Sequence, residues 1–122
     1  MSDSRQRLGR LGEALARRRL QELGYRIVDA NYRAPSGEID LVAEHGSSLV
    51  FVEVRTRSGR SFGQPEESIT HRKRSHMVDA AREYMAASQA GEREWRIDLV
   101  AIEMSADGRL ERVDVLENAV EL

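Results

Sequence analysis

Residues 37–57 carry the sequence GEIDLVAEHGSSLVFVEVRTR, which predicts two apolar β-strands joined by a tight turn at Gly46. Each strand contains one acid, Asp40 or Glu53, among Ile, Leu, Val and Phe residues. An unpaired carboxylate in such surroundings is costly because burial removes its hydration. A partner must therefore neutralise the two acids, and the pattern favours a metal ion.

The turn determines which residues of the two strands face each other. If Glu44 pairs with Leu49, the antiparallel register places Asp40 directly opposite Glu53. Opposed side chains on one sheet face have Cβ atoms about 4.5–5.5 Å apart, and like charges there repel each other. A divalent cation between the carboxylates would turn this repulsion into ligation, and hard cations such as Mg²⁺ prefer oxygen ligands. The same register predicts two further facing pairs, Val42 with Phe51 and Glu38 with Arg55.

Alternation along the second strand places Glu53, Arg55 and Arg57 on one face. A structural ladder of Glu and Arg on a solvated face would give a similar pattern, so this alternative stays open. The strand is nevertheless apolar on both faces, with Val50, Val52 and Val54 on one and Leu49 and Phe51 on the other. Such strands are usually covered on both sides, and we therefore expect a functional metal pair rather than a surface ladder.

The composition fits one globular domain spanning residues 1–122, with 40% hydrophobic and 33% charged side chains. The absence of cysteine excludes disulfides and thiolate metal sites. Because there is no apolar run of about 18 residues and no apolar signal core, we expect a cytoplasmic protein without a membrane partner. Residues 1–74 hold 14 Lys and Arg against 10 Asp and Glu, whereas residues 75–122 hold 5 against 11. The basic half contains Asp40 and Glu53, which suits a polyanionic ligand.

Hydrophobic periodicity and turn residues predict the remaining elements. We expect helices at 5–23 and Thr70–Ser88, and strands at Tyr25–Asn31, Arg96–Met104 and Leu110–Leu116, with a turn at 32–37 and a loop at 58–68. The last of these strands is expected at the edge of the sheet. The loop, which contains Arg60, either covers a substrate or only connects two elements.

Two single residues stand out in these elements. Lys73 is the only lysine among 19 basic residues, and it lies four residues before Met77 on the expected buried stripe of the second helix. Its ammonium either points toward the sheet or escapes to solvent while the stem packs. Asp98 interrupts an apolar strand, and we expect it to accept structural hydrogen bonds rather than to bind a metal.

The order of these pieces resembles the restriction-endonuclease-like nuclease superfamily: a helix with Glu13, a strand, residues 37–40, residues 52–55 and a second helix. More closely, the chain resembles the YraN-like family of small uncharacterised bacterial proteins, which are related in fold to archaeal Holliday junction resolvases. The matching segments cover nearly the whole chain: Gly12-Glu13-Ala14, Gly24-Tyr25, Asn31-Tyr32-Arg33, residues 37–41, residues 51–57, Phe62-Gly63, Lys73 and Arg96-Ile97-Asp98. The separate motifs are short, and their order and spacing together carry the resemblance.

The resemblance implies an α/β fold in which a mixed central sheet of about five strands is flanked by α-helices, with a magnesium site at its centre. It implies that Asp40 and Glu53 bind Mg²⁺, or Mn²⁺ in its place, with the carbonyl of Val54 and the carboxylate of Glu13 nearby. Position 55 would normally hold a lysine that orients the attacking water or stabilises charge on the phosphate. Arg55 stays protonated, so it cannot act as a base, although it can clamp a phosphate.

The activity implied by the resemblance is Mg²⁺-dependent hydrolysis of DNA phosphodiester bonds by an endonuclease that acts as a homodimer on branched DNA in repair or recombination. The candidate catalytic residues are Asp40, Glu53, Arg55 and Lys73, with Lys73 supplying the ammonium that position 55 lacks. The candidate nucleic-acid contacts are Arg55, Arg57, Arg60 and Lys73. Two alternatives stay open. One is a nuclease-fold domain that binds nucleic acid with little or no cleavage, which Arg55 favours, and the other is a protein-interaction domain with a vestigial site.

Overall fold

The computed structural model describes residues 3–59, 65, 69–88 and 90–120, and within these ranges the chain forms two α-helices and five β-strands. In chain order they are α1 (Asp3–Glu22), β1 (Arg26–Ala34), β2 (Gly37–His45), β3 (Ser48–Ser58), α2 (His71–Ala87), β4 (Trp95–Met104) and β5 (Leu110–Leu116). The helices and the last two strands begin and end within about two residues of the predicted positions. Most of the predicted loop at 58–68, including Arg60, lies outside the described residues.

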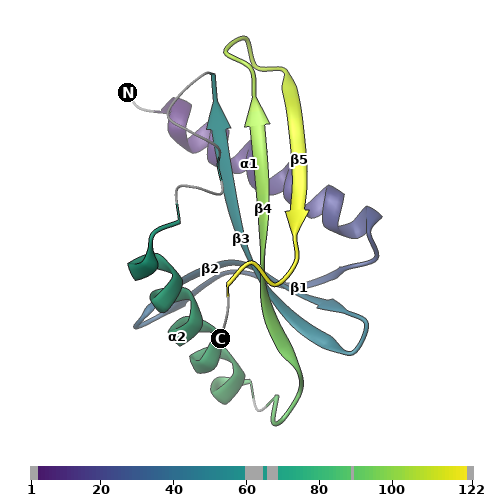
Figure 1. The fold of residues 1–122 in the computed structure, drawn as a ribbon, viewed down its shortest axis with the longest axis vertical. Coiled ribbons are helices and arrows are strands. Elements are labelled where there is room, and N and C mark those ends of the chain that lie inside the picture. Colours follow the sequence, from purple (N-terminus) through teal and green to yellow (C-terminus); the bar gives the residue numbers. More distant parts are fainter. Residues whose placement is uncertain (1–2, 60–64, 66–68, 89, 121–122) are drawn as a thin grey trace.

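The strands form one sheet in the order β1-β2-β3-β4-β5. β3 and β4 run parallel, whereas the other neighbouring strands are antiparallel. A parallel pair needs a crossover connection, and α2 lies within the connection that joins β3 to β4. In Figure 1 the β1–β2 hairpin crosses the direction of β3, β4 and β5, so the sheet is strongly twisted. The predicted mixed α/β sheet with β5 at its edge is confirmed.

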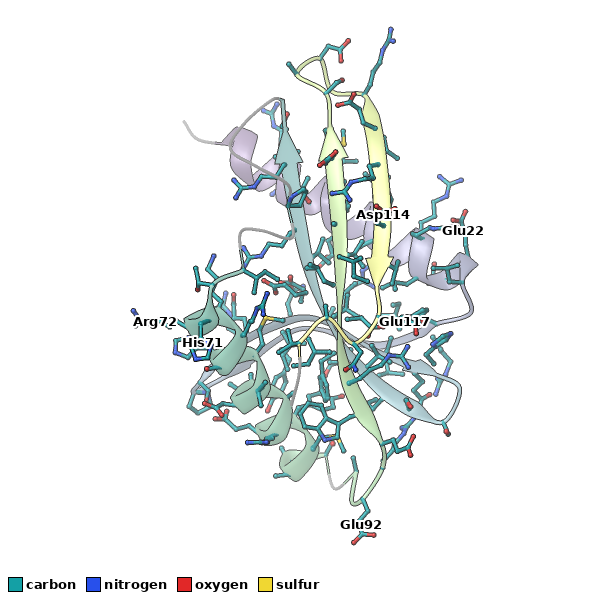
Figure 2. The ribbon with its side chains drawn as sticks, viewed as in Figure 1. Glu22, His71, Arg72, Glu92, Asp114 and Glu117 are labelled. Atoms are coloured by element: carbon teal, nitrogen blue, oxygen red, sulfur yellow. The ribbon has the colours of Figure 1, made fainter. Side chains whose placement is uncertain are left out.

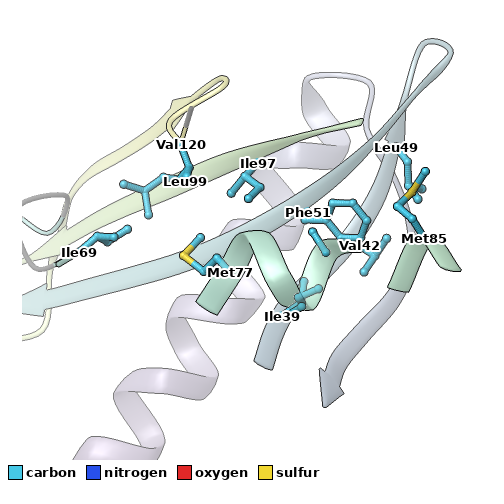
Figure 3. Close-up of a cluster of buried hydrophobic side chains, with 12 residues drawn as sticks. Ile39, Val42, Leu49, Phe51, Ile69, Met77, Met85, Ile97, Leu99 and Val120 are labelled. Atoms are coloured by element: carbon cyan, nitrogen blue, oxygen red, sulfur yellow. The ribbon is translucent and has the colours of Figure 1, made fainter. Parts of the chain in front are cut away.

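The two helices cover opposite faces of the sheet (Figure 1). Leu20 of α1 packs with Val52 of β3 in one buried cluster. On the other face Met77 and Met85 of α2 pack with Phe51, also of β3 (Figure 3). β3 is therefore covered on both sides, as its two apolar faces predict. Neither helix, as far as the structure describes them, is long and apolar enough to cross a membrane.

The β2–β3 hairpin has the register that its turn predicts. Its paired residues include Glu44 with Leu49 and Val42 with Phe51. The ladder ends at Leu41 and Val52, one position before Asp40 would pair with Glu53. At that point Oδ2 of Asp40 accepts a hydrogen bond of 2.8 Å from the backbone N–H of Val54. The two acids therefore lie where the regular pairing of β2 and β3 stops.

β1 is longer than predicted. It spans Arg26–Ala34, and the turn predicted at 32–37 is therefore shorter than predicted, since only residues 35 and 36 separate β1 from β2. Across this short turn Arg33 pairs with Glu38, and Nε of Arg33 lies 2.9 Å from the Glu38 carboxylate. Pairing with β2 thus extends β1 through Tyr32 and Arg33, although the local sequence there indicates a turn. The predicted Glu38–Arg55 pair is also wrong, because Arg55 lies beyond the β2–β3 ladder.

A polar cluster ties the residue before β1 and the end of β2 to β4 and to the segment after β5. The carboxylate of Asp98 is fully buried and accepts hydrogen bonds from Tyr25 Oη (2.7 Å), Arg96 Nε (2.9 Å) and the Asn118 N–H (2.9 Å). Arg96 also lies 2.8 Å from Nδ1 of His45, whose ring stacks on Tyr25 at 4.0 Å. Burial, followed by the neighbouring Asp98 carboxylate, raises the pKa of Tyr25. The predicted structural function of Asp98 is confirmed by these hydrogen bonds.

Candidate metal and nucleic-acid site

An open cavity of about 1190 Å³ is lined by α1, by β1, β2 and β3, and by the first turn of α2. Its charged lining residues among those described are Arg10, Glu13, Arg33, Asp40, Arg55, Arg57 and Lys73. Because its cations outnumber its acids by five to two, the cavity suits an anionic ligand. A second cavity of about 390 Å³ shares several of these residues and also reaches Glu53 and His76.

Asp40 and Glu53 are close enough to influence each other's ionisation. Both side chains are partly buried at the end of the β2–β3 ladder. Burial, the negative charge of Asp40 and a hydrogen bond between the two carboxyl groups together raise the pKa of Glu53 to about 8. The structure therefore brings together the two acids that the sequence singles out. Their charges are only partly compensated by the surrounding cations.

Arg55 forms an ion pair with Glu53. Its terminal nitrogen lies 2.8 Å from a carboxylate oxygen of Glu53, and the two side chains are 25% and 13% exposed. The Nε of Arg55 is buried and has no hydrogen-bond partner in the described part of the protein. The positive charges of Arg55 and Lys73 lower the pKa of Glu53, but less than burial and Asp40 raise it. Arg55 is therefore bound to an acid of the site rather than free to contact a ligand.

Lys73 lies in the first turn of α2, which begins after the N-cap residue Thr70. The hydroxyl of Thr70 accepts a hydrogen bond of 3.2 Å from the backbone N–H of Lys73. The Lys73 side chain is exposed to solvent, lines both cavities and acts electrostatically on Glu53. Of the two positions that the sequence leaves open for this ammonium, the structure shows an exposed side chain, whose charge still acts on Glu53 at the mouth of the site.

The beginning of α2 carries an unusual concentration of positive charge. His71, Arg72, Lys73 and Arg74 follow Thr70, and no acid is present in this first turn. Cations at a helix N-terminus interact unfavourably with the helix dipole. Figure 2 shows His71 and Arg72 extending outward from the start of α2. The basic turn does not stabilise the helix, but it adds positive potential next to the cavity.

Gly12 allows α1 to approach β3 closely. A Cβ atom at this position would overlap Oγ1 of Thr56. The close approach places Glu13 on the wall of the larger cavity, where its carboxylate lies 3.8 Å from Nε of Arg17. Within the described ranges, no three His, Asp or Glu side chains are grouped so that they could hold a metal ion. Glu13 as an additional metal ligand therefore stays a prediction.

Arg57 lines the larger cavity from β3, on the same side of the site as Arg55. Arg60, the remaining predicted nucleic-acid contact, lies outside the described residues. The cavity also contains residues for which sequence reasoning gave no function, namely Arg10, Asn31 and Arg33. Arg10 carries no local signal, since it is one of several arginines on α1 and its side chain is exposed. Asn31 and Arg33 belong to the segment Asn31-Tyr32-Arg33, which resembles the family pattern. This resemblance is the only feature of the sequence that points to a function for them.

The sequence matches the model of the family described as "Uncharacterised protein family UPF0102" over residues 12–102, and the chain belongs to this family. The predicted YraN-like membership is thereby confirmed. The matched region includes Glu13, Asp40, Glu53, Arg55 and Lys73.

Relatives of nearly equal length come from several bacteria. The UPF0102 protein of Moorella thermoacetica is 43% identical over 119 residues, which cover 98% of this chain and 99% of that protein. The UPF0102 protein of Pelotomaculum thermopropionicum is 41% identical over 119 residues, with the same coverage of 98% and 99%. The UPF0102 protein of Roseiflexus castenholzii is 42% identical over 122 residues, with 99% and 98% covered.

Proposed function

We propose that this protein is a Mg²⁺-dependent endonuclease that hydrolyses phosphodiester bonds of DNA, with Asp40 and Glu53 as metal ligands. The observation that carries the proposal is the coupled pair of partly buried carboxylates beside a cavity whose other charges are mainly positive. Two acids crowded together in this way are destabilising unless a cation compensates them. The acids can bind a metal ion, and the neighbouring cations can bind a phosphate. Such a site suits the hydrolysis of phosphodiester bonds.

The residues present fit a Mg²⁺ ion. In proteins Mg²⁺ keeps several waters and is bound by one or two carboxylates together with substrate phosphates, rather than by a complete cage of protein ligands. Asp40 and Glu53 would supply the carboxylates, and the carbonyl of Val54 a neutral oxygen donor. Mn²⁺ accepts the same donors. A bound dication would offset the burial and the negative charge of Asp40, which together raise the pKa of Glu53.

A Mg²⁺ ion at this site would lower the pKa of a water molecule and polarise a phosphoryl oxygen. The side chains of Arg57 and Lys73 would hold the phosphate and offset the negative charge that develops during hydrolysis. Lys73 would take the place of the lysine that position 55 lacks, because it is exposed at the mouth of the site. Arg55 would contribute its charge to the phosphate after it leaves Glu53.

The substrate is proposed to be branched or otherwise structured DNA, processed during repair or recombination by a homodimer. The mixed sheet between two helices and the spacing of the acids support a place in the restriction-endonuclease-like superfamily, whose resolvase-like members suggest this substrate. The cavity cations and the basic first turn of α2 would contact DNA phosphates without reading sequence. Recognition would then depend on the shape of the DNA rather than on its bases.

A second candidate function is nucleic-acid binding without efficient cleavage. The ion pair between Arg55 and Glu53 favours it, because a guanidinium that stays bound to a metal ligand competes with the metal. Arginine also cannot accept a proton from water. In this case the same cavity would bind DNA, while Mg²⁺ would bind weakly or not at all.

Metal titration and cleavage assays distinguish these functions. Isothermal calorimetry with Mg²⁺ and Mn²⁺ should detect binding to the wild type and its loss in the Asp40→Asn/Glu53→Gln double variant. Glu111→Gln is the matched control, because Glu111 is an exposed acid on β5 that lines neither cavity of the site. Unchanged binding in the double variant would exclude the proposed metal site.

Cleavage is then measured on linear duplex, single-stranded and four-way-junction DNA. The nuclease proposal predicts Mg²⁺-dependent cutting, fastest on the junction, that Glu53→Gln abolishes. Cutting that survives Glu53→Gln would come from a contaminating nuclease. DNA binding without cutting in the presence of Mg²⁺ would favour the second function.

A further inference from the structure

Asn31 has a left-handed backbone conformation in the middle of a β-strand. Its φ angle is 53°, although it lies within β1. Asn tolerates this region better than other residues with a side chain, and Gly tolerates it best. The cross-strand pairs on either side are Ala30 with Leu41 and Tyr32 with Ile39. Asn31 therefore lies opposite Asp40, one of the two acids of the site.

β1 changes the face on which it packs at this left-handed residue. Residues two apart in a regular strand point to the same face. Here Ala30 packs with the cluster beneath α1, whereas Tyr32 packs with the cluster beneath α2. The ring of Tyr32 meets the ring of Tyr84 edge-on at 4.9 Å, which fixes the strand on the α2 side. The backbone of Asn31 thus has a structural function in the twist of β1.

This structural function does not require a carboxamide, since glycine adopts the same backbone with less strain. The Asn31 side chain is exposed and lines the larger cavity together with Arg33 and Asp40. Within the described part of the chain, no side-chain hydrogen bond involves this carboxamide. The side chain is therefore available to a ligand in the cavity.

We propose that Asn31 is a nucleic-acid contact whose carboxamide N–H donates a hydrogen bond to a phosphate oxygen of the DNA strand bound in the cavity. The inference rests on the proposed function and extends the binding surface to the β1 side of Asp40. Arg10 and Arg33 line the same cavity and would attract the same phosphates. A neutral donor suits this position, because an acid opposite Asp40 would repel the DNA and an arginine would compete for the carboxylate. Asn side chains commonly contact phosphates in protein–DNA complexes.

Asn31→Gly separates the side chain from the backbone, because glycine keeps the left-handed conformation. We expect its thermal stability to match the wild type and its affinity for labelled duplex DNA, measured by fluorescence anisotropy in Ca²⁺, to fall about 3- to 10-fold. The slope of log affinity against log salt should stay unchanged, since no charge is lost. The matched control is Arg57→Gln, which removes a cavity cation and should lower this slope by about one. Wild-type affinity in Asn31→Gly would overturn the proposal.

Asn31→Asp gives an independent test with the metal alone. A carboxylate opposite Asp40 should tighten Mn²⁺ binding roughly fivefold or more in calorimetry, because it adds a negative charge beside the ion. It should also weaken DNA binding without metal. Unchanged Mn²⁺ affinity would place the side chain away from the site and contradict the proposal.

A wild type that binds neither Mn²⁺ nor DNA would refute the proposed function, whereas wild-type behaviour of both variants would refute only the assignment of Asn31.

Discussion

The guanidinium of Arg55 lies 2.8 Å from the carboxylate of Glu53, an acid that is itself coupled to Asp40. The chain thus supplies one internal cation to a pair of acids, at the position where the nucleases that its sequence resembles would carry a lysine. The pKa of Glu53 is nevertheless raised, so the ion pair does not fully compensate the two acids. A divalent cation and Arg55 would therefore compete for the same carboxylate.

The competition predicts that Arg55→Gln binds Mn²⁺ more tightly than the wild type. Removal of a positive charge within contact distance of the ion should strengthen binding by roughly fivefold or more. Calorimetry at constant ionic strength measures the effect, with Arg109→Gln as a control because Arg109 is exposed near the beginning of β5. Weaker binding in Arg55→Gln would mean that the arginine supports the metal instead of competing with it.

Arg55→Lys tests whether arginine limits catalysis. Lysine keeps the charge, but its compact ammonium makes no forked contact with Glu53 and can orient a water molecule. We expect the rate of Mg²⁺-dependent DNA cleavage to rise roughly tenfold or more. Single-turnover cleavage of the best DNA substrate measures this rate. An unchanged or lower rate would show that Arg55 does not limit the proposed cleavage.

The raised pKa of Glu53 predicts a pH-dependent stability. Because its folded pKa of about 8 lies above the ordinary value of 4.5, the folded protein holds a proton that the unfolded chain releases. This contribution to stability is fully present below about pH 4.5 and is lost as the pH rises through about 8. Glu53→Gln removes this pH-dependent contribution. Between about pH 5 and pH 9, the Tm of the variant should therefore fall by several degrees less than the Tm of the wild type. Parallel Tm profiles of the two proteins would contradict the assignment.

Added Mg²⁺ should change the same profile. Because metal binding requires an ionised carboxylate, Mg²⁺ should raise the Tm of the wild type more at high pH than at low pH. Thermal shift measurements with and without Mg²⁺ check this expectation. Glu111→Gln should behave like the wild type, whereas Glu53→Gln should lose the Mg²⁺ response.

The contact between Gly12 and Thr56 predicts a cost for any side chain at position 12. Gly12→Ala should lower the free energy of unfolding by about 1–3 kcal/mol, because its Cβ would overlap Oγ1 of Thr56. Gly9→Ala is the matched control on the same helix. An added Cβ there meets no atom within 4 Å, so alanine should stabilise the helix by up to about 1 kcal/mol.

Urea unfolding of the two alanine variants measures these changes. Thr56→Ala removes the overlapping hydroxyl and should recover part of the stability of Gly12→Ala in the double variant. Equal effects of Gly9→Ala and Gly12→Ala would contradict the close approach of α1 to β3.

The buried cluster around Asp98 predicts a large structural effect that is separate from the proposed metal site. Asp98→Asn should destabilise the protein by about 3–5 kcal/mol, because Arg96 and Tyr25 lose a buried anionic partner. Asp98 lines neither cavity of the site, so the folded variant should keep wild-type Mn²⁺ affinity. Chemical unfolding and calorimetry measure the two quantities. A loss of Mn²⁺ affinity without destabilisation would make Asp98 a metal ligand.

Much of the fold follows from local sequence patterns. The β2–β3 register could be predicted because a short turn sets it and the apolar residues on each face fit only one alignment. The end of α1 followed from the periodicity of its leucines and from Gly24 as a C-terminal signal. β1 was predicted too short, since pairing with β2 stabilises the strand through Tyr32 and Arg33 against a local turn signal.

The candidate site was predictable only in part. Asp40 and Glu53 are visible because each interrupts an apolar strand. The spacing of Lys73 to Met77 left open whether its ammonium approaches the sheet or reaches solvent, and the structure shows it exposed beside the cavity. Asn31 could not be found in this way, because its signal is a backbone angle that appears only when β1 pairs with β2. The ion pair that occupies Arg55 depends likewise on where regular pairing of β2 and β3 stops.

The central claim is that one cation binds between Asp40 and Glu53, and a crystal soaked in Mn²⁺ tests it most directly. Anomalous scattering identifies the ion and its ligands. The account predicts one Mn²⁺ ion with oxygen ligands from both carboxylates, and an Arg55 guanidinium that has left Glu53. The account would be contradicted by a crystal structure that is determined at saturating Mn²⁺ and shows no ion at this position, with the 2.8 Å ion pair between Arg55 and Glu53 intact.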